Sequence, residues 1–198
     1  MRDVRSYPLS MLFLAICASV FAVAQLTDVE NVRFLALDSA MFPDRWWTIV
    51  TTGFVHVEWN HIIVNMLLLL WVGTWVERLI GSRRFAVLVF TAILAGALSI
   101  LVRDTAGIGF SAAAAAIVFY YHVAFPFERE LPLRIPNIVL PVVLFVGSLA
   151  AAVFGWFEGV GHWPHLAGAV VGLLLLAVFR RHHRPLEDDE PQPATLHE

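Results

Sequence analysis

The chain has 198 residues, of which 59% are apolar and 15% charged, with a mean hydropathy of +0.75 and a formal net charge of −3. A soluble domain is about half apolar and about a quarter charged. The composition therefore excludes a disordered chain, a coiled coil and an ordinary soluble enzyme, and indicates a multi-pass membrane protein. Its charge gives no sign of nucleic-acid binding, and a single cysteine, Cys17, excludes an intrachain disulfide.

Six apolar stretches are long enough, or nearly so, to cross a bilayer as helices, which takes about 20 residues each. They are expected at about Pro8–Leu26, within Trp47–Leu79, and at about Phe85–Val102, Phe110–Phe127, Ile138–Phe157 and His165–Phe179. We therefore expect an all-α integral membrane bundle of six transmembrane helices in residues 1–181. A polar, disordered tail is expected in residues 182–198.

Arginine placement predicts the orientation of these spans, because cytoplasmic loops carry an excess of positive charge. With the N-terminus in the cytoplasm, only Arg33, Arg45 and Arg103 of the 13 arginines lie outside. Both termini and the tail are then cytoplasmic, and a prokaryotic plasma membrane is the simplest location for so short a core. One alternative stays open: Ala22-Val23-Ala24 resembles a signal-peptidase site, and cleavage there would leave five spans.

Polar and ionisable residues inside an apolar span are functional candidates, because lipid does not solvate them. The second span opens with His56, His61 and Asn65, the fourth with Ser111 and the sixth with His165. These three spans run in the same direction in the predicted topology. The five side chains are therefore expected at one depth, in the outer half of the membrane.

The groups brought together at that depth suggest a reaction. A serine within hydrogen-bond reach of a histidine is an activated nucleophile with its base. Ser111 also follows Gly109-Phe110 at the start of a helix, where free backbone N–H groups and the helix dipole favour a developing anion. His61 and Asn65 are four residues apart, share a helix face and could complete an oxyanion hole.

A packing motif would bring the two key helices together. Gly168 and Gly172 follow His165 as a GxxxG pattern, which lets another helix approach closely, and the alanine run Ala112–Ala116 after Ser111 is small enough to be that helix. Each feature alone has a plain alternative: serine can bond to its own helix, GxxxG can serve packing only, and a terminal histidine can be interfacial. Their conjunction at one depth favours a site.

These residues resemble the motifs of the rhomboid family of intramembrane serine proteases, over about Trp46–Phe179. Four family motifs are met in order: H-x4-H-x3-N by His56, His61 and Asn65, G-x3-E-x3-G by Gly73, Glu77 and Gly81, G-x-S-G by Gly109, Ser111 and, in place of the last glycine, Ala112, and H-x2-G-x3-G by His165, Gly168 and Gly172.

The resemblance implies a protease that uses a Ser–His dyad, with no metal or other cofactor, to cut transmembrane segments of membrane proteins near their outer ends. Ser111 is then the nucleophile and His165 the general base. The oxyanion is stabilised by His61, Asn65 and the Ser111 backbone N–H, while His56 and Gly109 support the site.

The resemblance also assigns roles to three segments. The fifth span and the loop Trp156–Pro164 would be the substrate gate and cap, and Thr27–Trp47 the membrane-embedded first loop. For Glu77, we expect an ion pair with neighbouring arginines or a cap that fixes the loop Gly81–Arg84.

Four positions depart from the family pattern. Ala112 carries a Cβ that could crowd a substrate, and Ala115 stands where the family usually has an aromatic ring against the catalytic histidine. Thr48 stands where arginine is usual, and Pro164 precedes the histidine of the last motif. The departures bear on rate and substrate preference, because none removes a reacting group.

Three other kinds of function are open. A non-catalytic rhomboid-like binder of transmembrane clients is the main alternative, although the chain keeps both Ser111 and His165. A metalloprotease could use several histidines, including His162, but the sequence has no H-E-x-x-H motif. A transporter would show inverted repeats, and none is visible.

Overall fold

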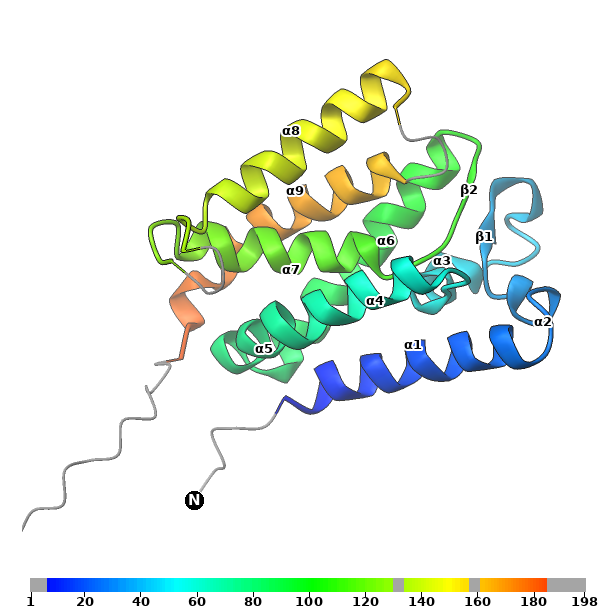
Figure 1. The fold of residues 1–198 in the computed structure, drawn as a ribbon, viewed down its shortest axis with the longest axis horizontal. Helices are drawn as coiled ribbons and strands as arrows, with labels where there is room; N and C mark the ends of the chain where they lie inside the picture. Colours follow the sequence, from blue (N-terminus) through cyan, green and yellow to red (C-terminus); the bar gives the residue numbers. More distant parts are fainter. Residues whose placement is uncertain (1–6, 130–133, 157–160, 185–198) are drawn as a thin grey trace, which may run out of the picture.

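The computed structural model describes residues 7–129, 134–156 and 161–184, and these residues are mainly helical (Figure 1). Its elements are α1 (Pro8–Leu26), α2 (Glu30–Arg33), β1 (Leu37–Asp38), η1 (Ser39–Met41), α3 (Thr48–Thr51), η2 (Thr52–Phe54), α4 (Trp59–Leu68), the π-helical η3 (Leu69–Gly73), α5 (Thr74–Ile80), α6 (Ser82–Val102), β2 (Ala106–Gly107), α7 (Ser111–Ala124), α8 (Val139–Phe154), α9 (His162–Phe179) and η4 (Arg180–His182). The predicted fold class, a mainly helical membrane protein, is confirmed.

Four helical segments of the described chain are long and apolar enough to cross a membrane: Pro8–Leu26, Trp59–Ile80, Ser82–Val102 and His162–His182. The helices α7 and α8 are also apolar but have only 14 and 16 residues. Both end earlier than predicted. Pro126 lies two residues beyond the end of α7 and disfavours continuation of that helix. The helix α8 ends at Phe154, and the next residue, Gly155, has a left-handed φ of +69°.

The helix α7 is the centre of the bundle, and α8 lies at its edge. Ten of the 14 residues of α7 are buried. In α8 only Pro141 and Ala151 are buried, and it packs mainly on α9 and less on α7. Figure 1 shows α8 lying along the outer side of α9, with α1 on the opposite side of the bundle. Among the longer helices of the described chain, α8 therefore has the least packing to hold it in place.

The helices α7 and α9 touch through their backbones. Gly168 and Gly172 of α9 face the carbonyl oxygens of Ala112 and Ala116 of α7, and a Cβ added at either glycine would collide with that backbone. Close contact of this kind requires small residues on both helices. It brings the N-terminal ends of α7 and α9, which carry Ser111 and His165, to the same end of the bundle.

The first helix is part of the same core. It runs without a break through residues 22–24 and places Phe13, Cys17 and Phe21 in the main hydrophobic cluster, against residues of α4, α6 and α7. The alternative in which residues 22–24 are a cleavage site would remove these buried side chains from the bundle.

A two-stranded sheet links the segment after α1 to the loop before α7. Leu37 of β1 pairs with Gly107 of β2, and Asp38 with Ala106, in antiparallel register. The sequence did not predict this sheet, because a strand of two residues has no readable alternation. It fixes part of the predicted first loop, Thr27–Trp47, directly beside the residues that lead into Ser111.

Glu77 is buried in α5 and caps the first helix. Its Oε1 accepts hydrogen bonds from Leu9 N (3.0 Å) and Ser82 Oγ (2.7 Å), and its Oε2 accepts from Ser10 N (2.8 Å) and Ser10 Oγ (2.7 Å). Two of these donors are N–H groups that the first turn of α1 leaves without an intrahelical partner. The Ser82 bond agrees with the expected cap on the loop Gly81–Arg84, whereas the cap on α1 was not predicted. None of the described arginines forms an ion pair with Glu77.

Candidate active site

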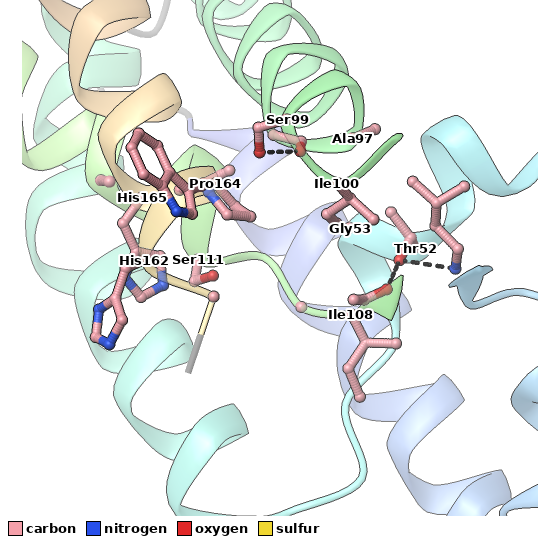
Figure 2. A pocket seen from close by; sticks show the side chains of 18 of the residues that line it. Thr52, Gly53, Ala97, Ser99, Ile100, Ile108, Ser111, His162, Pro164 and His165 are labelled. Atoms are coloured by element: carbon pink, nitrogen blue, oxygen red, sulfur yellow. Dashed lines mark hydrogen bonds between the residues drawn. The ribbon is translucent and has the colours of Figure 1, made fainter. Parts of the chain in front are cut away.

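A cavity of about 1350 Å³ opens where α4, α7 and α9 begin. Five of the residues that the sequence singled out line it: His61, Asn65, Gly109, Ser111 and His165. Figure 2 shows the side chains of Ser111, His162 and His165 together on one side of this cavity, with Thr52 and Ile108 on the other. The structure thus brings together side chains that are up to 104 residues apart in the sequence.

Ser111 is the first residue of α7. Phe110 precedes it at the N-cap position, and the Phe110 carbonyl accepts the first helical hydrogen bond, from Ala114 N at 2.9 Å. The N–H groups of the first turn have no intrahelical acceptor and carry the positive end of the helix dipole. Ser111 is partly exposed and lines the cavity.

His165 lies in the first turn of α9 and is partly buried. Within the described residues no hydrogen bond joins its ring to Ser111 Oγ. In unliganded active sites such hydrogen bonds are often long, and they tighten when substrate binds. The His165 ring centroid is 6.3 Å from that of His162, whose Nε2 lies 3.1 Å from the carbonyl oxygen of Trp156.

His162 also lines the cavity, and at the sequence level it was only a candidate metal ligand. Its position at the first residue of α9, three residues before His165, places both imidazoles on one side of the helix. Among the residues that the structure describes, no group of three or more His, Cys, Asp or Glu side chains is arranged to hold a metal ion.

His56 is fully buried behind the cavity and holds the peptide just before the nucleophile. Its Nε2 accepts a hydrogen bond from the Phe110 backbone N–H at 3.3 Å and lies 3.4 Å from Asn65 Nδ2. An imidazole nitrogen that accepts from a backbone N–H carries no proton, so His56 is neutral in this arrangement. Its ring also packs edge-on against His61, with 4.9 Å between centroids.

The Asn65 amide is engaged within its own helix. Asn65 Nδ2 donates to the carbonyl oxygen of His61 at 2.9 Å and lies 3.4 Å from His56 Nε2. Asn65 is almost completely buried. For the Asn65 amide to donate to an oxyanion at Ser111, it would have to release one of these two partners.

Position 109 requires glycine for two reasons. Its φ of +111° is a backbone conformation that residues with a Cβ rarely adopt. A Cβ at this position would also collide with the imidazole of His61. The Gly109 N–H donates to the carbonyl oxygen of Thr52 at 2.9 Å. Thr52 was missed at the sequence level, because a threonine in a short turn carries no motif.

The structure shows what the side chains contact at two of the positions that depart from the family pattern, Ala112 and Thr48. The Cβ of Ala112 faces Gly96 of α6, where a second Cβ would come within 2.8 Å of it, so this methyl packs between helices. Thr48 is buried and donates its hydroxyl to the Arg45 carbonyl at 2.6 Å. Ala115, in contrast, lines the cavity one turn after Ser111.

Comparison with known proteins matches residues 43–182 to the family model described as the Rhomboid domain. The chain is 28% identical over 184 residues to Rhomboid protease GlpG of Serratia proteamaculans, which covers 88% of this chain and 64% of the relative. It is 30% identical over 148 residues to the chloroplastic Rhomboid-like protein 11 of Arabidopsis thaliana, covering 68% and 52%. It is 27% identical over 180 residues to Rhomboid protease GluP of Bacillus subtilis, covering 84% and 34%.

The chain therefore spans between 34% and 64% of the length of these three relatives. The matched domain covers well over half of the chain and includes every candidate site residue, from His56 to Gly172. Together with the apolar helices of the bundle, this match shows that the chain is an integral membrane protein that belongs to the rhomboid family.

Proposed function

We propose that this protein is an intramembrane serine endopeptidase that cuts transmembrane segments near their outer ends with a Ser111–His165 dyad. The observation that carries the proposal is that Ser111, His165, His61 and Asn65 line one cavity at the starts of three apolar helices. A hydroxyl and imidazoles are costly inside an apolar bundle, and their convergence on one accessible space is best explained by chemistry.

The reaction would follow the general course of serine acyl transfer. His165 takes the proton from Ser111 Oγ as the oxygen attacks the carbonyl carbon of the scissile peptide bond, and then gives that proton to the leaving amine. A water molecule next attacks the acyl-enzyme and loses its proton to His165. The ester bond breaks, and the proton returns to Ser111 Oγ.

The negative charge on the substrate oxygen would be stabilised by the Ser111 backbone N–H, His61 and Asn65. Asn65 would leave the His61 carbonyl, to which it donates at 2.9 Å in the resting site. His56 would keep the Phe110 peptide in place during this exchange, through its 3.3 Å hydrogen bond. Gly109 would allow His61 to lie directly against the loop that carries the nucleophile.

The short central helix supports hydrolysis inside the membrane. With 14 residues, α7 is about 21 Å long, which is shorter than the roughly 30 Å of a bilayer core. If its C-terminal end lies at the cytoplasmic face, Ser111 lies below the outer surface, and the cavity supplies water to it. We propose six crossing helices in residues 1–181 with both termini cytoplasmic, in a prokaryotic plasma membrane. The predicted tail, 182–198, falls mostly outside the described residues.

Substrate entry is proposed at α8, which has the fewest buried residues among the described helices longer than four residues. A transmembrane segment could reach the cavity from the lipid by displacing α8 from α7 and α9. Part of the predicted cap, Trp156–Pro164, lies outside the described residues. A substrate helix must also unwind before its peptide bonds become accessible, so small or helix-breaking residues near the cut are favoured.

Labelling with a fluorophosphonate probe tests the proposal without knowledge of a substrate. Detergent-solubilised wild type is expected to be labelled, whereas Ser111→Ala and His165→Ala are not, with thermal stability unchanged in both variants. Treatment with a chelator is expected to leave proteolytic activity unchanged, and loss of that activity would favour a metalloprotease. No labelling of folded wild type would overturn the proposal in favour of a non-catalytic binder of transmembrane clients.

A further inference from the structure

The loop that carries the nucleophile is held from one side by a residue outside every family motif. We propose that Thr52 is a positioning residue, whose hydroxyl and carbonyl lock the first loop, through β1, to the segment Gly107–Ser111. This inference rests on the proposed function for its effect on catalysis. Its structural part, the lock itself, stands on hydrogen bonds of the described residues.

The Thr52 hydroxyl forms hydrogen bonds to both strands, β1 and β2. It donates to the Gly107 carbonyl at 2.5 Å and accepts the Leu37 backbone N–H at 3.2 Å. Leu37 and Gly107 are also partners in the register of β1 and β2. Figure 2 shows both bonds converging on Thr52. One hydroxyl therefore completes the hydrogen bonding of two chain segments that are 70 residues apart.

The Thr52 carbonyl continues the lock toward the nucleophile. It accepts the Gly109 N–H at 2.9 Å, two residues before Ser111. The next N–H, of Phe110, is held by His56 at 3.3 Å. Two consecutive peptides before the nucleophile are therefore fixed by the segment that runs from η2 into α4. Their position sets where α7 begins.

Burial makes the Thr52 hydroxyl difficult to replace. Thr52 is only 4% exposed and Leu37 is fully buried, so water does not readily take over a lost hydrogen bond. Valine has almost the same shape as threonine but neither donates nor accepts. In Thr52→Val the buried Leu37 N–H would lose its acceptor and the partly buried Gly107 carbonyl would lose its donor. A buried polar group without a partner is costly, so the Leu37 N–H carries most of this penalty.

The test compares Thr52→Val with Thr52→Ser, which keeps the hydroxyl but loses the methyl group. Thr74→Val is the matched control. Thr74 is also buried, but its hydroxyl bonds only within its own helix, to the Leu70 carbonyl at 2.8 Å and the Trp71 carbonyl at 3.4 Å. Each variant is purified as the full chain in detergent. Three quantities are measured: the rate constant of fluorophosphonate labelling, thermal stability and backbone hydrogen exchange.

We expect Thr52→Val to lower the labelling rate constant on the order of 10- to 100-fold, as for a small displacement of a reacting group. The loss should persist at temperatures where the variant is fully folded. Thr52→Ser should keep most of the wild-type rate, and Thr74→Val should change stability without changing the rate. Equal losses in Thr52→Val and Thr74→Val would overturn the proposal, because the effect would then be one of general stability.

Hydrogen exchange separates this proposal from the proposed function. In Thr52→Val the amides of Leu37 and Gly109 should exchange faster than in wild type, while those of α5 do not change. That result supports the lock even if the wild type is not labelled and the catalytic proposal has failed. Unchanged exchange at Leu37 and Gly109 would show that the hydroxyl does not hold the two segments, whatever the activity.

Discussion

Polar side chains gather at two opposite ends of this apolar bundle, and they are held very differently. At one end, the Glu77 cluster consists of Leu9, Ser10, Glu77 and Ser82, and every carboxylate oxygen accepts two hydrogen bonds. At the other end, the cavity cluster consists of His61, Asn65, Ser111 and His165, which line an open space. Figure 1 shows α5, which carries Glu77, far from the start of α7.

The contrast shows how to separate structural from chemical polar groups in a membrane protein. Glu77 is 1% exposed, and both of its carboxylate oxygens already accept two hydrogen bonds each. It can therefore stabilise the bundle, but it has no hydrogen-bond acceptor left for a ligand. Ser111 is accessible, and no described residue bonds to its hydroxyl. Unused hydrogen-bonding capacity beside a cavity, rather than polarity alone, marks the candidate site.

The largest effect is expected from the contact that holds the cavity cluster together. Gly168→Leu places a side chain against the Ala112 backbone, so α7 and α9 must separate. We expect loss of labelling together with a large fall in thermal stability. Gly147→Leu in α8 is the matched control, because a Cβ there has no atom within 4 Å. A stable, labelled Gly168→Leu variant would contradict the backbone contact.

Removing the proposed oxyanion donor Asn65 should affect the labelling rate more than stability. Asn65→Ala is expected to lower the labelling rate constant roughly 10- to 1,000-fold, as for the loss of a single donor elsewhere. Thermal stability should change much less than in the glycine variant. The exposed Asn31→Ala in α2 is the control. A rate equal to that of wild type would mean that Asn65 serves only its bonds to His61 and His56.

The Glu77 cluster should give the reverse pattern. In Glu77→Ala four donors lose their acceptor, and we expect the bundle to lose about 3 kcal/mol of stability. Molecules that remain folded should be labelled at the wild-type rate, because the change lies far from Ser111. Denaturant unfolding in detergent and labelling at low temperature measure the two quantities. The exposed Glu30→Gln should change neither quantity. A lower labelling rate in folded Glu77→Ala would contradict the view that the Glu77 cluster affects stability only.

The smallest effect is expected from pH at the far end of α9. His183 Nε2 lies 2.9 Å from the Tyr120 hydroxyl, and burial lowers the pKa of His183. The unfolded chain then takes up a proton before the folded chain does, so this contribution to stability falls as pH drops below about 6.5. His183→Gln should slightly reduce the acid sensitivity of thermal unfolding between pH 7 and 5. An unchanged pH dependence would show that this contact is not linked to folding.

Much of the fold could be predicted from the sequence because apolar length and helix breakers are local signals. The predicted first span, Pro8–Leu26, has the same bounds as α1. The candidate site residues were found because histidine, asparagine and serine are conspicuous among apolar residues. The ends of α7 and α8 were placed too late, since apolar residues continue past Ala124 and Phe154. The six-span count and the orientation stay predictions.

Local sequence determined that this chain forms apolar helices and that their polar residues fall near helix starts, because hydropathy and residue type act over a few neighbours. The tertiary structure alone decided which of those residues meet. It directed the Ala112 methyl toward Gly96 and placed the His56 ring against the Phe110 backbone N–H. It also joined Thr52 to Leu37 and Gly107. These contacts connect distant segments through single atoms, and such pairings leave no periodic or compositional trace in a sequence.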